Sequence, residues 1–392
     1  MLGLLSVATL VLLSDQCQEI RMIAEDGTVV VGRSLEFSVL DSFLLTFPKG
    51  TEHIMPKLPA CETPFQFDSN FNTFTTRMRL DTGEWSNGDL GGMNEAGLSA
   101  STLYFPKFAY FPEPDTLGSE ICDIPHLSFV RLAEFVLATF GTVQEIRDAM
   151  TADMFPVVFS EKDMGLQHPV HFQFIDKSGD AMVLEYTEAT GRKVFNNTVG
   201  VFTNSPPFDW HMENLRNYPQ LENRNRKGFG YKFKGDEFFI PTAGSGSGFA
   251  GLPGDYTSVS RFVKAVALLK FAKKPSNRDE ALAQTFHLMN AADVPKGIIE
   301  IPIEDHASEE KTGDSEEKKN RNNLPKIIYD ATSFIVVKSL EEGCIYTRAY
   351  TNIAIERICF KEMKKDIVRY TALDGAWKKS YKVIKPSDMK EF

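Results

Sequence analysis

Cys17 carries the strongest chemical signature in this chain. It follows a short apolar leader, Met1–Gln16, and it opens a strand-turn-strand pattern that runs to Phe37. Cleavage before Cys17 would place a thiol and a free α-amine on one residue. That amine has an ordinary pKa of about 7.7 to 8.0, so it can accept the thiol proton at neutral pH while the thiolate attacks an amide carbonyl. The position predicts amide hydrolysis that needs no histidine.

The turn of this hairpin predicts which residue lies opposite Cys17. The Asp-Gly pair at 26–27 is a strong signal for a two-residue turn between apolar runs. If Glu25 pairs with Thr28, Cys17 lies opposite Glu36, with Cβ atoms about 4.5 to 5.5 Å apart. We therefore expect the Glu36 carboxylate within reach of the Cys17 amine.

Arg33 is a cation on the second strand of the same hairpin. It lies three residues before Glu36, so strict alternation places it on the other side of the hairpin. A bulge at Gly32 could re-aim Arg33 toward the thiol. Spacing alone leaves both orientations open.

Four motifs follow one another along the chain. The first joins Cys17 to the run GRSLEF at 32–37, the second reads GMNEAGL at 92–98, the third TNSPPFDWH at 203–211, and the fourth GLPGDYTSVSRF at 251–262. In this order they resemble the choloylglycine hydrolase family, the bile-salt hydrolases and penicillin V acylases. The resemblance implies hydrolysis of linear amide bonds other than peptide bonds, with no metal and no organic cofactor.

The resemblance also implies roles for residues of the hairpin. Cys17 matches the nucleophile, and Arg33 matches the arginine beside it, where a fixed positive charge favours the thiolate. Glu36 falls where the best-known members carry an aspartate that hydrogen-bonds the amine of the nucleophile. The additional methylene of Glu36 is the main departure from the family pattern.

Three further residues match the family site. Asn204 matches the asparagine whose side chain donates to the oxyanion that forms on the scissile carbonyl. Tyr104 falls where bile-salt hydrolases carry asparagine and penicillin V acylases carry tyrosine; its backbone N–H completes the oxyanion hole. Arg261 matches the second active-site arginine. An aromatic side chain at Tyr104 favours penicillin V or an N-acyl homoserine lactone over a bulky conjugated bile salt as substrate.

Other functions match this sequence less well. A cysteine–histidine pair needs a partner histidine, and only His211 of the seven histidines lies in a motif; no papain-type sequence surrounds Cys17, so His211 is interpreted as structural. The run at 246–251 satisfies G-x-G-x-x-G, but a helix pair follows it instead of a βαβ unit, which argues against dinucleotide binding. A non-catalytic homologue that binds acylated amides stays open, because Glu36 replaces aspartate and because Gln16 is not the small residue that a signal peptidase prefers before its cleavage site.

Composition and charge limit the partners and the compartment. The chain has 392 residues, a net charge of −10 and a pI near 5.4, which argues against nucleic-acid binding. Its 31 phenylalanines suffice for a packed core and for apolar pockets. The apolar run of the leader is shorter than the roughly 20 residues that span a bilayer, and it fits a signal peptide. We therefore expect a secreted or periplasmic protein; a retained first strand is the alternative.

Strand and helix patterns alternate along the chain in blocks. This order predicts an α+β fold, a four-layer αββα sandwich of two antiparallel sheets between helix layers, which the resemblance to N-terminal-nucleophile hydrolases also implies. We expect one domain, 17–392, with a charged loop at 304–325; the resemblance implies homotetramers. In an oxidising compartment the four cysteines at 61, 122, 344 and 359 could pair in three ways, but their scattered spacing shows no dense disulfide framework, and they are interpreted as buried thiols. The expected helices are 125–141, 143–151, 258–273 and 278–291, and the expected strands are a meander over 171–204 followed by 331–338, 344–350 and 353–360.

Overall fold

The computed structural model describes most of the chain between Gln16 and Thr371. The described residues are 16–37, 42–78, 88–160, 169–242, 244–302, 327–363 and 368–371. The leader upstream of Gln16 and the charged loop at 304–325 lie outside the described residues. Among the described helices, none is long and apolar enough to cross a membrane.

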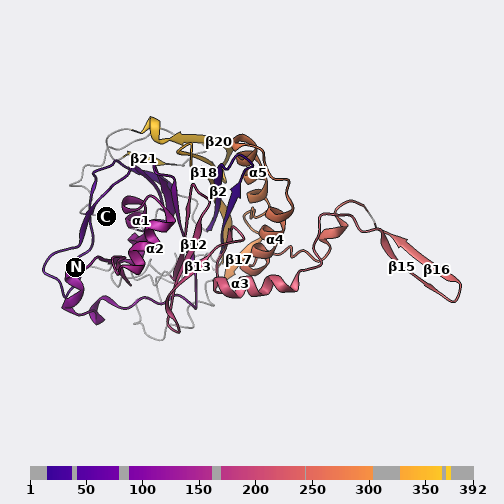
Figure 1. Ribbon diagram of the computed structural model, residues 1–392, viewed down its shortest axis with the longest axis horizontal. Coiled ribbons are helices and arrows are strands. Elements are labelled where there is room, and N and C mark those ends of the chain that lie inside the picture. Colours follow the sequence, from indigo (N-terminus) through magenta and orange to yellow (C-terminus); the bar gives the residue numbers. More distant parts are fainter. Residues whose placement is uncertain are drawn as a thin grey trace.

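Two antiparallel sheets form the centre of the molecule (Figure 1). The first has the strand order β14-β1-β2-β18-β19-β20, with β17 paired to β18, and the second has the order β13-β12-β11-β8-β7-β6-β3-β21. The first consists of β1 Cys17–Ile23, β2 Val29–Phe37, β14 Val201–Phe202, β17 Ile299–Pro302, β18 Ile327–Ser339, β19 Cys344–Ala349 and β20 Asn352–Cys359. The second consists of β3 Ser42–Phe47, β6 Thr73–Met78, β7 Gly91–Asn94, β8 Leu98–Tyr104, β11 Val170–Asp176, β12 Ala181–Thr187, β13 Gly191–Asn196 and β21 Val368–Thr371.

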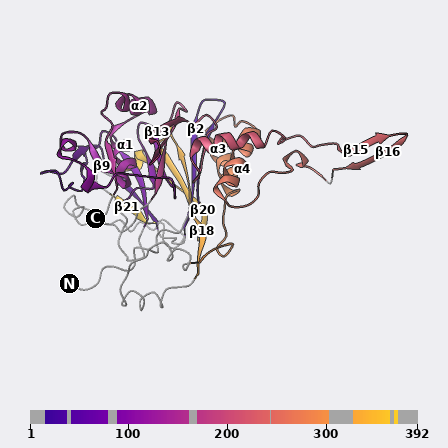
Figure 2. The same ribbon diagram turned by 90° about the horizontal axis from the view of Figure 1, so that it is seen from below.

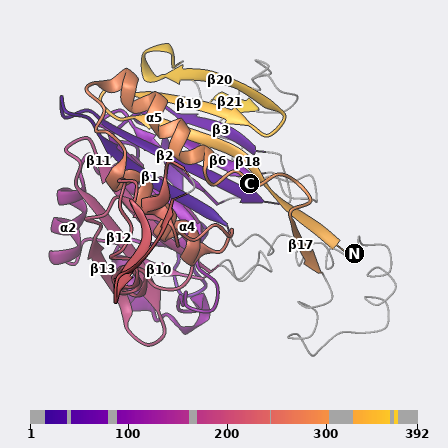
Figure 3. The same ribbon diagram turned by 90° about the vertical axis from the view of Figure 1, so that its right-hand side faces the viewer.

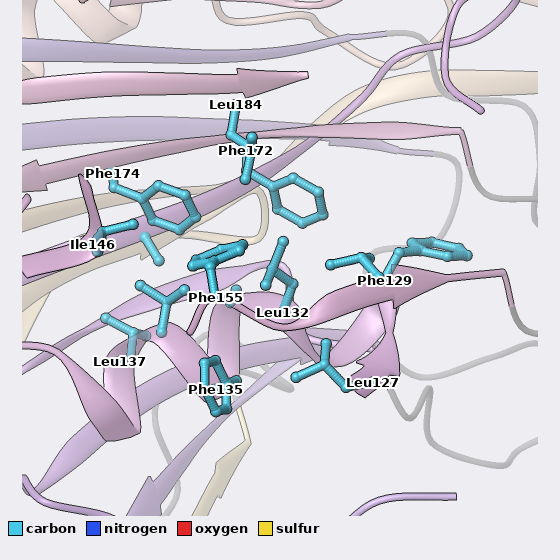
Figure 4. Packing of buried hydrophobic residues seen from close by; sticks show 14 of the residues in the cluster. Leu127, Phe129, Leu132, Phe135, Leu137, Ile146, Phe155, Phe172, Phe174 and Leu184 are labelled. Atoms are coloured by element: carbon cyan, nitrogen blue, oxygen red, sulfur yellow. The ribbon is translucent and has the colours of Figure 1, made fainter. Parts of the chain in front are cut away.

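Helices cover the outer face of each sheet. Helices α1, Leu132–Thr139, and α2, Val143–Thr151, pack on the eight-stranded sheet, and Figure 4 shows the phenylalanines of β11 facing them. Helices α4, Ser258–Phe271, and α5, Arg278–Asn290, cover β1 and β2 of the other sheet (Figure 3). The predicted α+β sandwich with four αββα layers is therefore confirmed.

Capping residues begin the helices where the sequence predicts. The Thr142 side chain accepts from the backbone N–H of Glu145 and begins α2. The Asn277 side chain accepts from the backbone N–H groups of Asp279 and Glu280 and begins α5. The helix expected over 125–141 is shorter, because short strand β9, His126–Ser128, and a 3-10 turn precede α1.

The strand meander ends earlier than the sequence pattern predicts. Strands β11, β12 and β13 pair in series, but β14 leaves this sheet and pairs with β1 of the other one. Gly200, with φ of +70°, lies at this crossing and donates from its N–H to the side chain of Asn197. The crossing carries Asn204 to the N-terminal end of β1.

The register of the first hairpin differs by one residue from the prediction. Cys17 pairs with Leu35, not with Glu36. The cause is the turn: Ala24 N–H donates to Thr28 O at 2.9 Å, so the loop has three residues and ends on Gly27 with φ of +91°. A glycine with positive φ at the third position is typical of such a loop.

The four remaining cysteines form two disulfides, so the interpretation as buried thiols is wrong. Cys61 bonds to Cys122, which lies 61 residues away in sequence, and Cys344 bonds to Cys359, its direct partner across β19 and β20. Scattered spacing in the sequence concealed both pairs. Cys17 is the free cysteine of the chain.

A two-stranded hairpin projects from the body of the molecule (Figures 1 and 2). It consists of β15, Gly228–Phe233, and β16, Asp236–Pro241. Alternate residues of the two strands form one apolar face, since Phe229 pairs with Ile240 and Tyr231 with Phe238. All four of these side chains are exposed.

The other helices and strands of the described chain are short: α3 Phe208–Asn214, β4 Glu52–Ile54, β5 Gln66–Asp68 and β10 Val157–Phe159.

Candidate active site

Cys17 lies between the two sheets, at the start of β1. It is 4% exposed. Its backbone N–H donates to Asn204 Oδ1 at 2.7 Å, and its carbonyl oxygen accepts from Arg261 Nη1 at 2.5 Å. Both backbone polar groups of Cys17 are thus fixed by residues that are distant in sequence.

Arg33 lies beside the Cys17 thiol, which decides between the two orientations that spacing left open. In the observed register Arg33 pairs with Glu19, so its side chain is on the same face of the hairpin as Cys17. Its Nη2 donates to Thr102 O of β8 at 2.6 Å. Arg33 also hydrogen-bonds the thiol, and both its charge and this bond lower the pKa of Cys17. No bulge at Gly32 is needed.

Gly91 provides the space for the Arg33 guanidinium. Its φ of +125° is unfavourable for any other residue. A Cβ at Gly91 would lie 3.0 Å from Arg33 Nη1 and 2.3 Å from Ala100 O. The second sheet therefore contributes both the carbonyl that holds Arg33 and the opening that admits it.

Asn204 connects Cys17 to two other predicted site residues. Its Oδ1 accepts from Arg261 Nη2 at 2.8 Å as well as from the Cys17 N–H, and its Nδ2 donates to Tyr104 O at 2.8 Å. The neutral His211 ring donates from Nε2 to Asn204 O at 2.9 Å, because burial lowers the pKa of His211 to about 4. His211 thus positions Asn204, as the structural interpretation expects.

Two further residues hold the segment that carries Asn204. His171 Nε2 donates to Thr203 O at 2.8 Å, and its Nδ1 lies 3.0 Å from Glu185 Oε1. The same carboxylate oxygen accepts from the Phe208 N–H at 3.0 Å. The segment 203–208 is therefore tied at both ends to the eight-stranded sheet.

Glu36 lies on the opposite face of the hairpin from Arg33 and Cys17. Its backbone N–H donates to Gln16 O at 3.0 Å, and its Oε1 accepts from Thr332 Oγ1 at 3.2 Å. The carboxylate is fully buried, and burial raises the pKa of Glu36 to about 7, against a lowering by Arg261. The expectation that Glu36 lies directly opposite Cys17 is wrong by one residue, and its strand partner is Gln16.

Opposing effects set the pKa of the Cys17 thiol. Burial is the largest cause and raises it; the Glu36 carboxylate raises it further, while Arg33 and Arg261 lower it. No histidine is among these groups in the described part of the chain. The arrangement therefore fits a nucleophile stabilised by arginines more than a cysteine–histidine pair.

Sequence reasoning missed four buried polar residues behind the nucleophile. Glu19 bonds to Lys338, Ser101 and Gln173, which come from three other strands of the two sheets. Glu19 could have been found, because it lies two residues after Cys17 and alternation puts both side chains on one face. Nothing in the sequence around Lys338 marks it.

The other sequence candidates lie elsewhere. The G-x-G-x-x-G run at 246–251 forms a short 3-10 turn next to the projecting hairpin and precedes no strand-helix-strand unit. Glu342 lies near the sulfurs of Cys344 and Cys359, but their disulfide leaves no thiolate for a metal in this described cluster.

Comparison with known proteins gives a consistent family. A model of the family described as linear amide C–N hydrolases, choloylglycine hydrolase family, matches residues 17–312. A bile salt hydrolase/transferase of Clostridium perfringens (strain 13 / Type A) is 32% identical over 293 residues, which cover 74% of this chain and 76% of that protein. A penicillin V acylase of Pectobacterium atrosepticum is 26% identical over 222 residues, which cover 53% of this chain and 50% of that protein.

Solved structures share the fold. A variant of conjugated bile acid hydrolase from Clostridium perfringens superposes with a TM-score of 0.69 at 23% identity, over 91% of this chain and 96% of that one. A penicillin V acylase from Agrobacterium tumefaciens gives a TM-score of 0.66 at 22% identity, over 94% and 98%. At these identities the likeness bears on the architecture alone, and it agrees with the two sheets between helix layers.

Proposed function

This chain belongs to the choloylglycine hydrolase family of linear amide C–N hydrolases, and we propose that it cleaves its substrate with Cys17 as an N-terminal nucleophile. The supporting observation is the meeting of Cys17, Arg33, Asn204 and Arg261 in one buried layer. These residues come from β1, β2, the crossing after β14, and α4. They place two cations and one amide around Cys17.

Removal of Gln16 would prepare both the nucleophile and the base. Gln16 continues β1 by one position and occupies the place opposite Glu36, since the Glu36 N–H donates to Gln16 O. Cleavage would replace the Gln16–Cys17 peptide with an α-amine beside Glu36 and Asn204. The amine could then accept the thiol proton, and Glu36 would orient it.

The proposed reaction proceeds through a thioester. The Cys17 sulfur attacks the amide carbon, and Arg33 stabilises the thiolate that precedes the attack. Asn204 Nδ2 exchanges its bond to Tyr104 O for the oxyanion, to which the Tyr104 backbone N–H also donates. The C–N bond breaks, the amine product takes the proton, and water then hydrolyses the thioester. Arg261 keeps Asn204 and the Cys17 carbonyl fixed during these steps.

The substrate class proposed is a small-molecule amide with a flat or slender acyl group. Tyr104 ends β8, and its carbonyl already contacts Asn204. An aromatic side chain there crowds a steroid, so we propose penicillin V or an N-acyl homoserine lactone before a conjugated bile salt. A non-catalytic homologue that binds such amides is the second candidate, and it is favoured only by Glu36 in place of aspartate.

Compartment and assembly follow from other regions of the molecule. The two disulfides support a secreted or periplasmic location for the single domain 17–392, since such bonds persist in oxidising compartments. Detection of the protein only in the cytoplasm of its host would contradict this location.

A two-stranded hairpin is marginal alone in water, so the apolar face of β15–β16 supports burial against further copies in a homotetramer. Sedimentation that finds only monomer at micromolar concentration would contradict the assembly.

Intact mass and activity together test the nucleophile. We expect the active protein to begin at Cys17, and we expect Cys17→Ala to have no turnover, because sulfur forms the bond to carbon. Cys17→Ser keeps at most weak turnover. A fully active preparation whose mass includes Met1, or full activity in Cys17→Ala, refutes the proposal. An active-length protein that binds the amides but never turns them over supports the non-catalytic homologue.

A further inference from the structure

Three charged side chains lie in a row behind the Cys17 thiol. Glu19 of β1 pairs directly with Arg33 of β2, and Lys338 of β18 lies one strand further, opposite Val31. Alternation puts all three on the face between the sheets. Glu19 is 0%, Arg33 4% and Lys338 2% exposed. Charges this deeply buried need partners of opposite sign.

The Glu19 carboxylate is engaged by groups other than Arg33. Its Oε2 accepts from Lys338 Nζ at 3.2 Å and from Ser101 Oγ, and its Oε1 accepts from Gln173 Nε2 at 2.7 Å. Lys338 Nζ also lies 3.2 Å from Ser101 Oγ. Arg33 instead bonds to Thr102 O and to the thiol. The single carboxylate thus has two nearby cations and pairs with the one that is farther from Cys17.

The pairing matters because Glu19 and Arg33 are direct partners across the hairpin. Residues opposite each other have Cβ atoms about 4.5 to 5.5 Å apart, within reach of a salt bridge. If Lys338 lost its charge, the buried Glu19 carboxylate would attract the guanidinium of Arg33. Arg33 would then leave the thiol, and the thiolate would lose the charge that stabilises it.

We propose that the Glu19–Lys338 ion pair keeps Arg33 directed at the Cys17 thiol, which makes Lys338 a positioning residue for the nucleophile. This inference rests on the proposed function, because it matters only if Cys17 attacks the substrate. The charged groups that act on the thiol are Arg33, Arg261 and Glu36. Lys338 acts through the first of these.

The pH dependence of Cys17 alkylation is the readout. Cys17 is the free cysteine of the chain, so iodoacetamide labels one site and intact mass follows it without turnover. In Lys338→Met we expect the alkylation profile to move up by about one pH unit, which is about tenfold slower labelling near neutral pH. We expect kcat to fall by about tenfold or more, with KM less affected.

A double variant separates charge compensation from packing. Glu19→Gln with Lys338→Met removes both charges, so nothing draws Arg33 away, and we expect labelling and kcat to return to within about threefold of the unmodified protein. The matched control is Lys264→Met, which removes a partly buried lysine that donates to Ala291 O. We expect that control to leave the alkylation profile unchanged.

Each outcome decides the inference. An unchanged alkylation profile in Lys338→Met, or a double variant as impaired as the single one, overturns it. If Lys338→Met does not fold, Ser101→Ala carries the test: it removes one donor to Glu19, and we expect a smaller shift in the same direction, whereas no shift overturns the inference. Turnover in Cys17→Ala would refute the proposed nucleophile, but it would not change what the alkylation profile reports about Arg33.

Discussion

Two buried polar clusters of this molecule both have the composition of an active site. One surrounds Cys17 between the sheets. The other, the α1 cluster, includes Glu134 of α1. There His53 Nε2 is 2.7 Å from Ser69 Oγ, and His53 Nδ1 is 2.6 Å from Glu134 Oε1. Those distances are typical of a serine–histidine–carboxylate triad. The types of residue in a cluster therefore do not by themselves identify the reactive site.

The balance of charge distinguishes the two clusters. In the α1 cluster Glu134 also bonds to Arg77 and Arg131, and Arg77 bonds to Asp89. Two arginines thus meet two carboxylates, and the His53 ring packs against the rings of Phe47 and Phe67.

The Cys17 cluster has an excess of positive charge instead. Arg33, Arg261 and Lys338 carry three positive charges near the two carboxylates of Glu19 and Glu36. A thiolate or an oxyanion would complete this balance. From this comparison we infer that the α1 cluster stabilises the fold, while the Cys17 cluster, with one more cation than carboxylates, is the one suited to a reaction.

The largest expected contrast is in turnover. Asn204→Ala removes the proposed oxyanion donor, so we expect kcat to fall by about 100- to 1,000-fold. Ser69→Ala removes the serine of the α1 cluster, and we expect kcat within about twofold of the unmodified protein. Steady-state kinetics on both variants, with circular dichroism to show that each is folded, measure the contrast. A large loss in Ser69→Ala with none in Asn204→Ala would reverse the assignment of the two clusters.

The next contrast is in stability. Glu134→Ala removes the carboxylate that Arg131 bonds to and one of the two that Arg77 bonds to, and we expect the free energy of unfolding to fall by about 3 to 5 kcal/mol. The folded fraction should keep its kcat. The control is Glu213→Ala, which breaks an exposed pair with Arg216 and should cost at most about 1 kcal/mol. Urea unfolding that gives equal losses for both variants contradicts a structural role for the α1 cluster.

Glu36 connects the reactive cluster to stability through pH. Its pKa of about 7 in the fold lies above the ordinary value of 4.5, so the folded chain binds this proton more tightly than the unfolded chain. The resulting stabilisation is complete below about pH 4.5 and is lost as pH rises to about 7. In protein that retains Gln16, we expect Glu36→Gln to raise the free energy of unfolding at pH 8 by about 1 to 3 kcal/mol.

Substitution of Glu36 should also act on catalysis in the processed enzyme. There Glu36 would orient the Cys17 amine, so we expect Glu36→Ala to lower kcat by roughly 10- to 1,000-fold and Glu36→Asp to lower it less. Urea unfolding at pH 5 and pH 8 measures the predicted change in the free energy of unfolding of Glu36→Gln. Identical pH dependence in Glu36→Gln and the unmodified chain, or unchanged kinetics in processed Glu36→Ala, would remove Glu36 from the site.

The fold was more predictable than the contacts of the site. The order of strands and helices indicated the four layers, and capping residues such as Thr142 located helix ends, because these signals are local. The hairpin register failed because it depends on a single positive φ at Gly27. Propensity does not distinguish a two-residue from a three-residue loop at an Asp-Gly turn.

Long-range pairs were beyond any local pattern. Lys338 meets Glu19 across 319 residues of sequence, and the disulfide partner of Cys61 is just as unmarked. The motif around Asn204 did place that residue near Cys17, through resemblance and not through spacing. The sequence therefore named candidate residues that the structure brings together, and only the arrangement of the sheets shows what holds them in place.

The smallest expected effect is on substrate choice, and it tests whether the Tyr104 side chain beside the Cys17 cluster selects the acyl group. Tyr104 contributes its backbone to Asn204, so Tyr104→Asn changes the side chain and keeps that contact. Misfit in an apolar pocket is worth about 1 to 3 kcal/mol per methylene-sized group, and we expect kcat/KM for penicillin V or an acyl homoserine lactone to exceed that for glycocholate. Tyr104→Asn should narrow this gap by about tenfold. The exposed Tyr110 gives a control, since Tyr110→Asn should leave the ratio unchanged. If glycocholate is preferred by about tenfold or more over every penicillin and lactone, the side chain of Tyr104 does not set the acyl group, and the pocket walls that do so lie elsewhere.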